Sequence, residues 1–189
     1  MSATSAPFGL KPAYHGSGGT VRPTIYSIRS TYAADILENQ PVRLVPSSTG
    51  EGTIVAAAIG ESLIGTFLGV SWTDSDGVRR YSNKWTSGTV GTDIQATVTL
   101  DPWITYEIQA DDTMTVADIG KQFEFNTVTA GSTVTGLSAV SLDVGSATTS
   151  AAMRLIGLNP GPDNNWGDAY PIVLVQIAKH QNVAVINAY

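Results

Sequence analysis

The sequence contains no cysteine, few charged residues and no long apolar run. Without cysteine, the chain can form neither a disulfide scaffold nor a thiolate metal site, and it has no thiol for catalysis. Only 14% of its 189 residues are charged, against about a quarter in an average soluble protein. Gly, Thr, Ser and Ala take their place, and such a weakly charged surface favours close packing against other protein.

The charge balance argues against a nucleic-acid partner. Ten Lys and Arg against sixteen Asp and Glu give a formal net charge of -6, whereas non-specific nucleic-acid binding depends on basic side chains that neutralise phosphates. Apolar runs such as Ile172 to Val175 are all far shorter than the roughly 20 residues of a membrane-spanning helix. Since residues 1–19 contain no apolar core flanked by positive charge, we expect a protein made in the cytoplasm, with no membrane partner.

The N-terminal region differs in composition from the rest. A chain of 189 residues is long enough for one well-buried domain and short for two. Residues 1–23 are rich in Gly and Pro, which disfavour regular structure, yet they carry Phe8, Leu10 and Tyr14, which a disordered tail usually lacks. We therefore predict an extended N-terminal docking arm over residues 1–23 and a β domain over residues 24–189. A disordered terminus is the alternative.

Apolar and polar residues alternate along most of the β domain, which is the pattern of half-buried strands. Ile104, Tyr106 and Ile108, for example, alternate with polar residues. The segment 172–178 is apolar on both faces, so we place it in a central strand. Further strands are expected at residues 42–45, 53–57, 63–72, 79–85, 96–100, 122–125, 137–142 and 153–158.

Turn signals rich in Gly, Asp, Asn and Pro separate these segments, as in an all-β sandwich or barrel. The alternation does not distinguish these two architectures. Ser30 could cap one short helix extending to Leu37, the only helical candidate. Within the expected strand 63–72, Gly65 and Gly69 indicate a bulge, a bend or the close approach of another backbone.

The segment 72–85 is predicted to form a β-hairpin with Asp76-Gly77 near its tip. It carries Arg79, Arg80 and Lys84, three of the ten basic residues. On an acidic protein, a basic hairpin could guide the molecule to an acidic partner surface. Alternatively, these charges only protect an exposed strand edge.

The residue patterns of catalytic and metal sites are absent. The two histidines, His15 and His180, lack the spacing of metal ligands, and Ser17 lies in a Gly-rich stretch with no strand before it, unlike a nucleophile elbow. The segment 74–77 resembles a fragment of a calcium loop without its remaining ligands, and turns explain the polar segment 163–168. We therefore predict no catalytic residue, no metal, no cofactor and no enzymatic activity.

Segments spread over nearly the whole chain share a further resemblance. At the N-terminus these are Ala6-Pro7-Phe8-Gly9-Leu10-Lys11-Pro12 and Arg22-Pro23. The others are Pro41-Val42, Ile64-Gly65-Thr66-Phe67-Leu68-Gly69-Val70, Asp101-Pro102, Asn165-Trp166-Gly167-Asp168 and Gln176-Ile177-Ala178-Lys179-His180-Gln181. Together they resemble the cement, or head decoration, proteins that are encoded beside the major capsid protein in tailed phages.

This resemblance implies a compact β domain of the barrel or tulip type that assembles as homotrimers on local threefold axes of an icosahedral shell. It implies a major capsid protein of the HK97-like fold as the partner, a place on the capsid exterior of the virion, and no catalysis. The candidate contacts with the capsid or a neighbouring subunit are then Phe8, Leu10, Tyr14, Arg22, Arg79, Arg80 and Lys84.

Two alternatives to a cement protein remain open. One is another phage structural component, such as a tail-tube or head-completion protein, which would share the β-rich composition. The other is a carbohydrate-binding β module, in which the four tryptophans would supply stacking faces. These tryptophans are Trp72, Trp85, Trp103 and Trp166.

Overall fold

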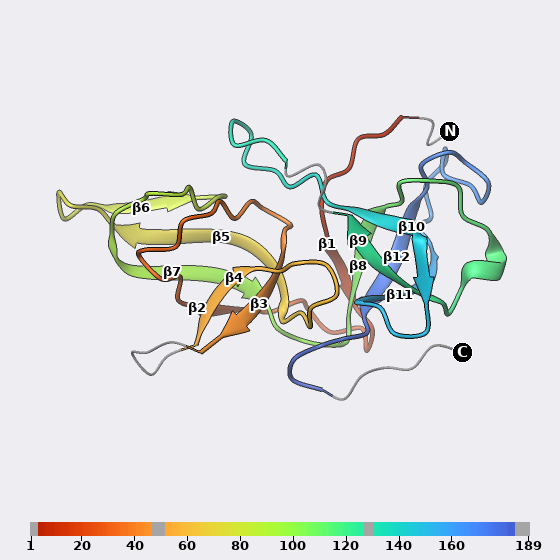
Figure 1. Cartoon of the computed structure of the whole chain (residues 1–189), viewed down its shortest axis with the longest axis horizontal. Helices are drawn as coiled ribbons and strands as arrows, with labels where there is room; N and C mark the ends of the chain where they lie inside the picture. Colours follow the sequence, from red (N-terminus) through yellow and green to blue (C-terminus); the bar gives the residue numbers. More distant parts are fainter. Residues whose placement is uncertain (1–3, 47–51, 127–130, 184–189) are drawn as a thin grey trace.

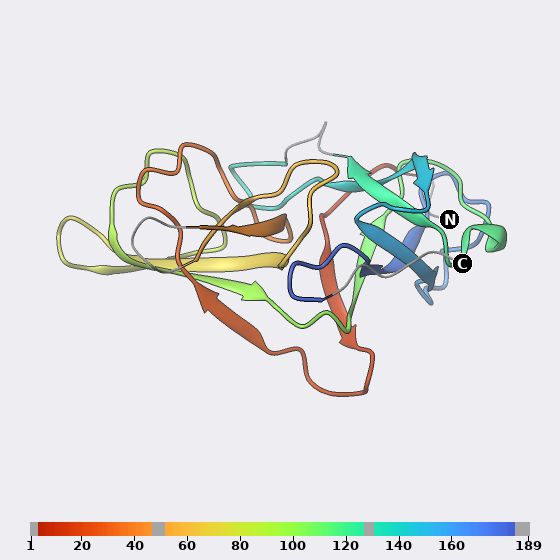
Figure 2. The ribbon, with the colours of Figure 1, turned by 60° about the horizontal axis from the view of Figure 1, so that its bottom comes forward.

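The computed structural model of the protein describes residues 4–46, 52–126 and 131–183. Strands account for 46% of the structure, and the described residues contain no α-helix, only a single 3-10 turn at Val116–Asp118. The strands form two separate antiparallel sheets that lie side by side along the long axis of the molecule (Figures 1 and 2). The predicted mainly β fold is therefore confirmed; the arrangement is sandwich-like, and the sheets do not close into a barrel.

The first sheet has six strands, and each pairs antiparallel with its neighbours. Their order across the sheet is β1 (Lys11–His15), β8 (Ile104–Gln109), β12 (Ile172–Ile177), β11 (Met153–Leu158), β9 (Gln122–Asn126) and β10 (Ser141–Thr148). The interior position of β12 confirms the central strand expected from its two apolar faces.

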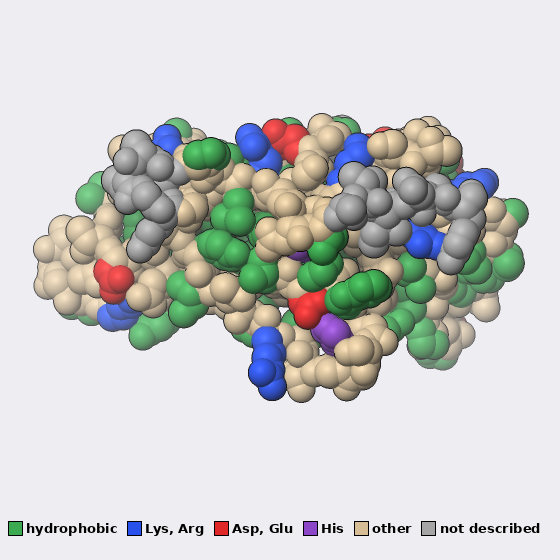
Figure 3. All heavy atoms as spheres, turned by 90° about the horizontal axis from the view of Figure 1, so that it is seen from below, with side chains coloured by type: hydrophobic (Ala, Val, Ile, Leu, Met, Phe, Trp, Pro, Cys, Tyr) green, Lys and Arg blue, Asp and Glu red, His purple; other side chains and the backbone are tan. Residues whose placement is uncertain are grey.

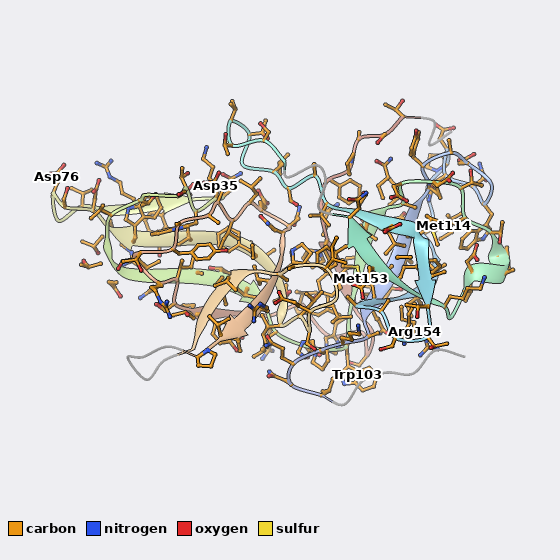
Figure 4. The ribbon with its side chains drawn as sticks, viewed as in Figure 1. Asp35, Asp76, Trp103, Met114, Met153 and Arg154 are labelled. Carbon is orange, nitrogen blue, oxygen red and sulfur yellow. The ribbon has the colours of Figure 1, made fainter. Side chains whose placement is uncertain are left out.

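The second sheet is built from the chain between the first two strands of the first sheet. Its order is β2 (Pro23–Tyr26), β7 (Thr92–Thr99), β5 (Gly65–Thr73), β3 (Pro41–Val45) and β4 (Thr53–Ala56), with β6 (Arg79–Ser82) beside β5. The sheet curls so far that its two outer strands, β2 and β4, come together at one isolated bridge between Ser27, directly after β2, and Thr53. β5 and β6 form the predicted hairpin, and Figure 4 shows Asp76 at its tip, at the far end of the molecule.

Each sheet packs its own hydrophobic core. The larger core lies against the first sheet and contains Tyr106, Phe123, Phe125 and Met153 among its fully buried side chains. The second core fills the curl of the second sheet, where the rings of Trp72 and Trp85 meet edge to face with centroids 6.0 Å apart. Burying the apolar face of each sheet supplies the main favourable free energy of folding.

The junction between the two sheets is buried and hydrogen-bonded. The chain crosses from β7 to β8 at the predicted break Asp101-Pro102, and the Leu63 and His180 backbones form a second bridge between the two halves. Gly65 packs so tightly that a Cβ on it would lie 1.8 Å from the Thr99 carbonyl oxygen. This confirms the close backbone approach that glycine in this strand indicated.

The helix expected between Ser30 and Leu37 is wrong. Ile36 instead pairs with Trp85, and the two residues exchange backbone hydrogen bonds of 2.9 and 2.8 Å. Both side chains are buried in the second core, so tertiary pairing overrides a weak local helix signal. The strand expected over residues 137–142 is also displaced, since β10 begins only at Ser141.

The extended N-terminal arm is not confirmed. Residues 11–15 form β1, which pairs with β8 as an edge strand of the first sheet. Leu10, directly before it, has no exposed surface and belongs to the larger core. Residues 10–15 of the predicted arm are therefore integrated into the fold of their own chain.

Candidate functional site

The three predicted arm anchors have different environments. Leu10 is fully buried in the protein's own core, so its assignment as a contact for a neighbour is corrected: the hydrophobic effect already holds it inside. Phe8 is half-buried. Tyr14 exposes 48% of its surface on β1, and of these three anchors it is the most accessible to a partner.

The basic side chains of the hairpin are bound within the chain. Arg79 forms an ion pair with Asp93 at 2.6 Å and also donates to the Ser71 hydroxyl. Arg80 pairs with Asp74 at 3.3 Å. Lys84 donates to the Thr133 carbonyl oxygen. The hairpin therefore does not present three free positive charges.

The fourth basic candidate is Arg22. It lies just before β2, is exposed, and its side chain has no hydrogen-bond or ion-pair partner among the described residues. Its charge is free to contact a partner.

Most of the tryptophans serve packing. Trp85 is 1% exposed, and Trp72 and Trp166 are half-buried against the two cores. Trp103 is 62% exposed at the crossing between the sheets, where Figure 4 shows it on the lower surface. The four tryptophans thus do not form a common stacking face of the kind a carbohydrate module would use.

The structure brings together three polar side chains that the sequence did not connect. The Ser17 hydroxyl lies 2.7 Å from Nδ1 of His15, and Nε2 of His15 lies 2.8 Å from Oδ2 of Asp101. The other carboxylate oxygen of Asp101 accepts the Trp103 backbone N–H at 2.8 Å. These hydrogen bonds, from Trp103 N–H and from His15, outweigh partial burial and lower the pKa of the Asp101 carboxyl.

This Ser17–His15–Asp101 relay has the order of groups of a nucleophilic triad. However, the Ser17 backbone N–H also donates to Nδ1 of His15, at 3.2 Å, as in a local turn. Ser17, His15 and Asp101 also line none of the molecule's larger pockets within the described residues. The relay therefore supports a simpler role: it fastens the Gly16–Gly19 loop to the crossing segment near Asp101.

A large cavity lies at the open end of the second sheet, with a volume of about 930 Å³. It is bordered by residues 25–30 within and after β2, by Gly52 and Thr53 at the start of β4, and by residues 91–95 at the start of β7. A smaller cavity of about 140 Å³ adjoins it and shares Arg29 and Thr53. Three strands that are distant in sequence thus form one concave site.

Two polar side chains of this site lack a partner among the described residues. Arg29 is exposed, and its side chain has no hydrogen-bond or ion-pair partner among the described residues. Thr53 is 5% exposed, and its buried hydroxyl also lacks a partner within the described part of the chain. A buried polar atom without a partner is costly and calls for an explanation. Asp93, an acidic residue of the lining, is already paired with Arg79, and burial raises the pKa of the Tyr26 phenol.

The sequence carries no signal for this cavity. Arg29 and Thr53 are isolated residues in different segments, and only the curl of the sheet brings them together. The relay was missed for a similar reason, since Asp101 lies 86 positions from His15. His15, Ser17 and Asp101 each appear ordinary when read locally.

The described residues show neither a metal site nor a membrane-spanning helix. In this part of the chain, no three His, Asp or Glu side chains lie together so that they could hold a metal ion. Within the same residues, no helix is long and apolar enough to cross a membrane. Comparison with known proteins finds no family model, no curated protein and no solved structure that matches this chain.

Proposed function

We propose that this chain is a non-enzymatic structural protein of a tailed-phage particle, which binds the capsid exterior as homotrimers and stabilises contacts between capsomers. The observation that carries the proposal is the exposure of large apolar side chains on both halves of a weakly charged surface. Tyr81 is 79% exposed in the second sheet's hairpin, Trp103 is 62% exposed at the crossing, and Tyr14 is 48% exposed on β1 of the first sheet. The family resemblance of the sequence supports the phage partner.

Single exposed apolar residues are ordinary on soluble proteins. Here, however, they occur with only 14% charged residues, and Figure 3 shows apolar side chains gathered in several patches along the length of one face. Aromatic side chains in such patches are the residues that most often anchor protein–protein interfaces. The two halves, joined through a buried junction, would let one molecule contact two neighbouring capsomers.

Each contact between the protein and a capsomer need have only modest affinity. A trimer that attaches at three points gains effective affinity from linkage, without any new type of contact. Many copies on one shell would add up to resistance against the pressure of packaged DNA. Tyr14, Arg22 and Trp103 are the accessible side chains that we assign to these contacts, together with Tyr81.

The first test is the mass of the purified protein in solution, measured by light scattering at tens of micromolar. A mass of three times 19.8 kDa supports the threefold arrangement. The second test is sedimentation of the protein with capsid shells assembled from a tailed-phage major capsid protein. Saturable binding in multiples of three copies supports the proposal, whereas rings or tubes of the protein alone, without shell binding, would favour a tail-tube component and contradict it.

The non-enzymatic part has its own test at the relay. A fluorophosphonate probe labels serines that are activated by a neighbouring base, because the serine oxygen attacks phosphorus and displaces fluoride. We expect no labelling of Ser17 beyond that of Ser75, an exposed serine in the hairpin turn that lies beside a carboxylate but has no histidine bonded to it. Selective labelling of Ser17 that is lost in His15→Gln would contradict a purely structural role.

A further inference from the structure

We propose that the cavity at the open end of the second sheet is a docking site for an extended, acidic peptide segment of a partner protein. The inference rests on the proposed function, in which that partner is the major capsid protein. It adds the place of contact and the chemistry of the segment that is bound. None of the residues predicted from the sequence as capsid contacts is among the described residues that line this cavity.

The strand register leaves a backbone edge open in this cavity. β2 pairs with β7 only from Pro23↔Thr99 to Tyr26↔Ala96. Beyond this point the chain after Tyr26 turns toward β4, as the bridge between Ser27 and Thr53 shows. Residues 92–95 of β7 thus have β5 on one side and the cavity on the other. Asp93 lies in a bulge of the β5–β7 pairing, and its carbonyl oxygen already accepts a hydrogen bond from Arg79, so the open edge is that of Ile94 and Gln95. An unpaired strand edge is a template for an added strand, whose main-chain hydrogen bonds would supply affinity.

The charge of the lining selects an acidic segment. Asp93 is neutralised by Arg79 at 2.6 Å, so the free charge among the described lining residues is that of Arg29. A guanidinium can bind a carboxylate with two parallel hydrogen bonds, which gives both strength and orientation. A carboxylate on the added strand would therefore complete the ion pair that Arg29 lacks within the described structure.

The Thr53 hydroxyl provides an independent observation. It is buried and has no partner among the described residues, although Thr53 lines both adjoining cavities together with Arg29. A ligand oxygen at this position would satisfy it and remove the cost of an unpaired buried group.

Apolar side chains supply the rest of the contact. Ile25, 63% exposed on β2, and Ile94, at the border of the core, both line the larger cavity. The side chains of a strand alternate between its two faces. A segment with alternating apolar and acidic residues would therefore place apolar side chains against Ile25 and Ile94 and its carboxylates near Arg29.

The test uses the full-length protein and a labelled eight-residue peptide in which valine alternates with glutamate, capped at both ends. Fluorescence anisotropy gives its dissociation constant, and the same peptide with glutamine for glutamate is the ligand control. We expect the acidic peptide to bind at least tenfold more tightly than the glutamine peptide. Arg29→Gln should remove this difference, while Lys121→Gln, which loses the same charge from an exposed side chain outside the cavity, should leave it unchanged.

Thr53→Val separates binding from folding. Because valine has the same shape and the hydroxyl makes no hydrogen bond to the described residues of the free protein, this variant should be at least as stable as the wild type. We nevertheless expect it to bind the acidic peptide several-fold more weakly. Unchanged peptide affinity in both Arg29→Gln and Thr53→Val would overturn the proposed site.

Two further results would also decide against the site. If 10 mM inorganic phosphate displaces the peptide completely at constant ionic strength, the cavity is a small-anion site and the peptide proposal fails. If Arg29→Gln still binds shells as tightly as the wild type, the cavity is not the capsid contact, yet the proposed function stands. Failure of the wild type itself to bind shells would instead remove the proposed function, whatever the peptide result.

Discussion

The hydroxyl groups of Thr99 and Tyr106 lie 2.9 Å apart and join the two sheets at the centre of the molecule. Thr99 is the last residue of β7 and Tyr106 lies in β8, and both are almost completely buried. The Thr99 oxygen also accepts the backbone N–H of Thr66 at 2.9 Å. One side chain therefore satisfies groups from β5 and β8, which belong to different sheets, and burial raises the pKa of the Tyr106 phenol.

Removing the Thr99 hydroxyl should be more harmful than removing that of Tyr106. Thr99→Val leaves both the Thr66 N–H and the Tyr106 hydroxyl buried without a partner, at about 1–3 kcal/mol for each group. Tyr106→Phe leaves the Thr99 oxygen with its Thr66 donor, and should cost only about 1 kcal/mol. Urea unfolding of both variants measures the difference. A larger loss in Tyr106→Phe would contradict this account of the junction.

Gly65 is required at the same junction because it lets two backbones approach. A Cβ here would lie 1.8 Å from the Thr99 carbonyl oxygen, and φ is +157°. We expect Gly65→Ala to destabilise the protein by more than about 3 kcal/mol or to prevent folding, as overpacking against backbone does. Gly157→Ala is the control, since a Cβ added at Gly157 would meet nothing within 4 Å. Equal thermal midpoints for the two variants would contradict the steric argument.

The strands were largely predictable because one physical rule decides them: each must bury one face. Alternation placed β8 and β9 closely, and the doubly apolar segment 172–178 identified the interior strand. The division into two sheets was not predictable, because alternation records which face is buried and not against what. Ile36 shows the limit of local propensity, since its pairing with Trp85 is decided across 49 positions of sequence.

The site residues were less predictable than the strands. Bulky side chains in a Gly- and Pro-rich segment indicate docking, but they do not tell whether the surface they dock on belongs to a partner or to the same chain. For Leu10 it is the same chain. Arg29 and Thr53 were missed because their significance lies in what they do not contact, and only a three-dimensional structure reveals an unpaired group.

Leu10 should therefore behave as a core residue. Leu10→Ala removes a fully buried side chain and should cost about 2–5 kcal/mol in the free energy of unfolding. Tyr14→Ala, at a position that is 48% exposed, should cost no more than about 1 kcal/mol and should weaken shell binding instead. Denaturant unfolding and shell sedimentation on both variants separate the two roles. A stable Leu10→Ala protein that no longer binds shells would restore the docking interpretation for this residue.

His180 should make the stability depend on pH. His180 is 3% exposed at the bridge to Leu63, and its Nδ1 accepts the Asn182 backbone N–H at 3.1 Å. Burial lowers the pKa of His180, although the Asp101 charge opposes this in part. The unfolded chain therefore takes up a proton near pH 6.5, and the folded chain only at a lower pH, so stability is complete above pH 6.5 and falls as the pH decreases below it. One group can contribute at most about 1.4 kcal/mol per pH unit.

We expect His180→Asn to flatten the pH dependence of the free energy of unfolding between about pH 6.5 and 5, before carboxylates such as Asp101 begin to titrate. Urea unfolding at a series of pH values measures this dependence. Identical slopes in the variant and the wild type would show that His180 is not the group responsible.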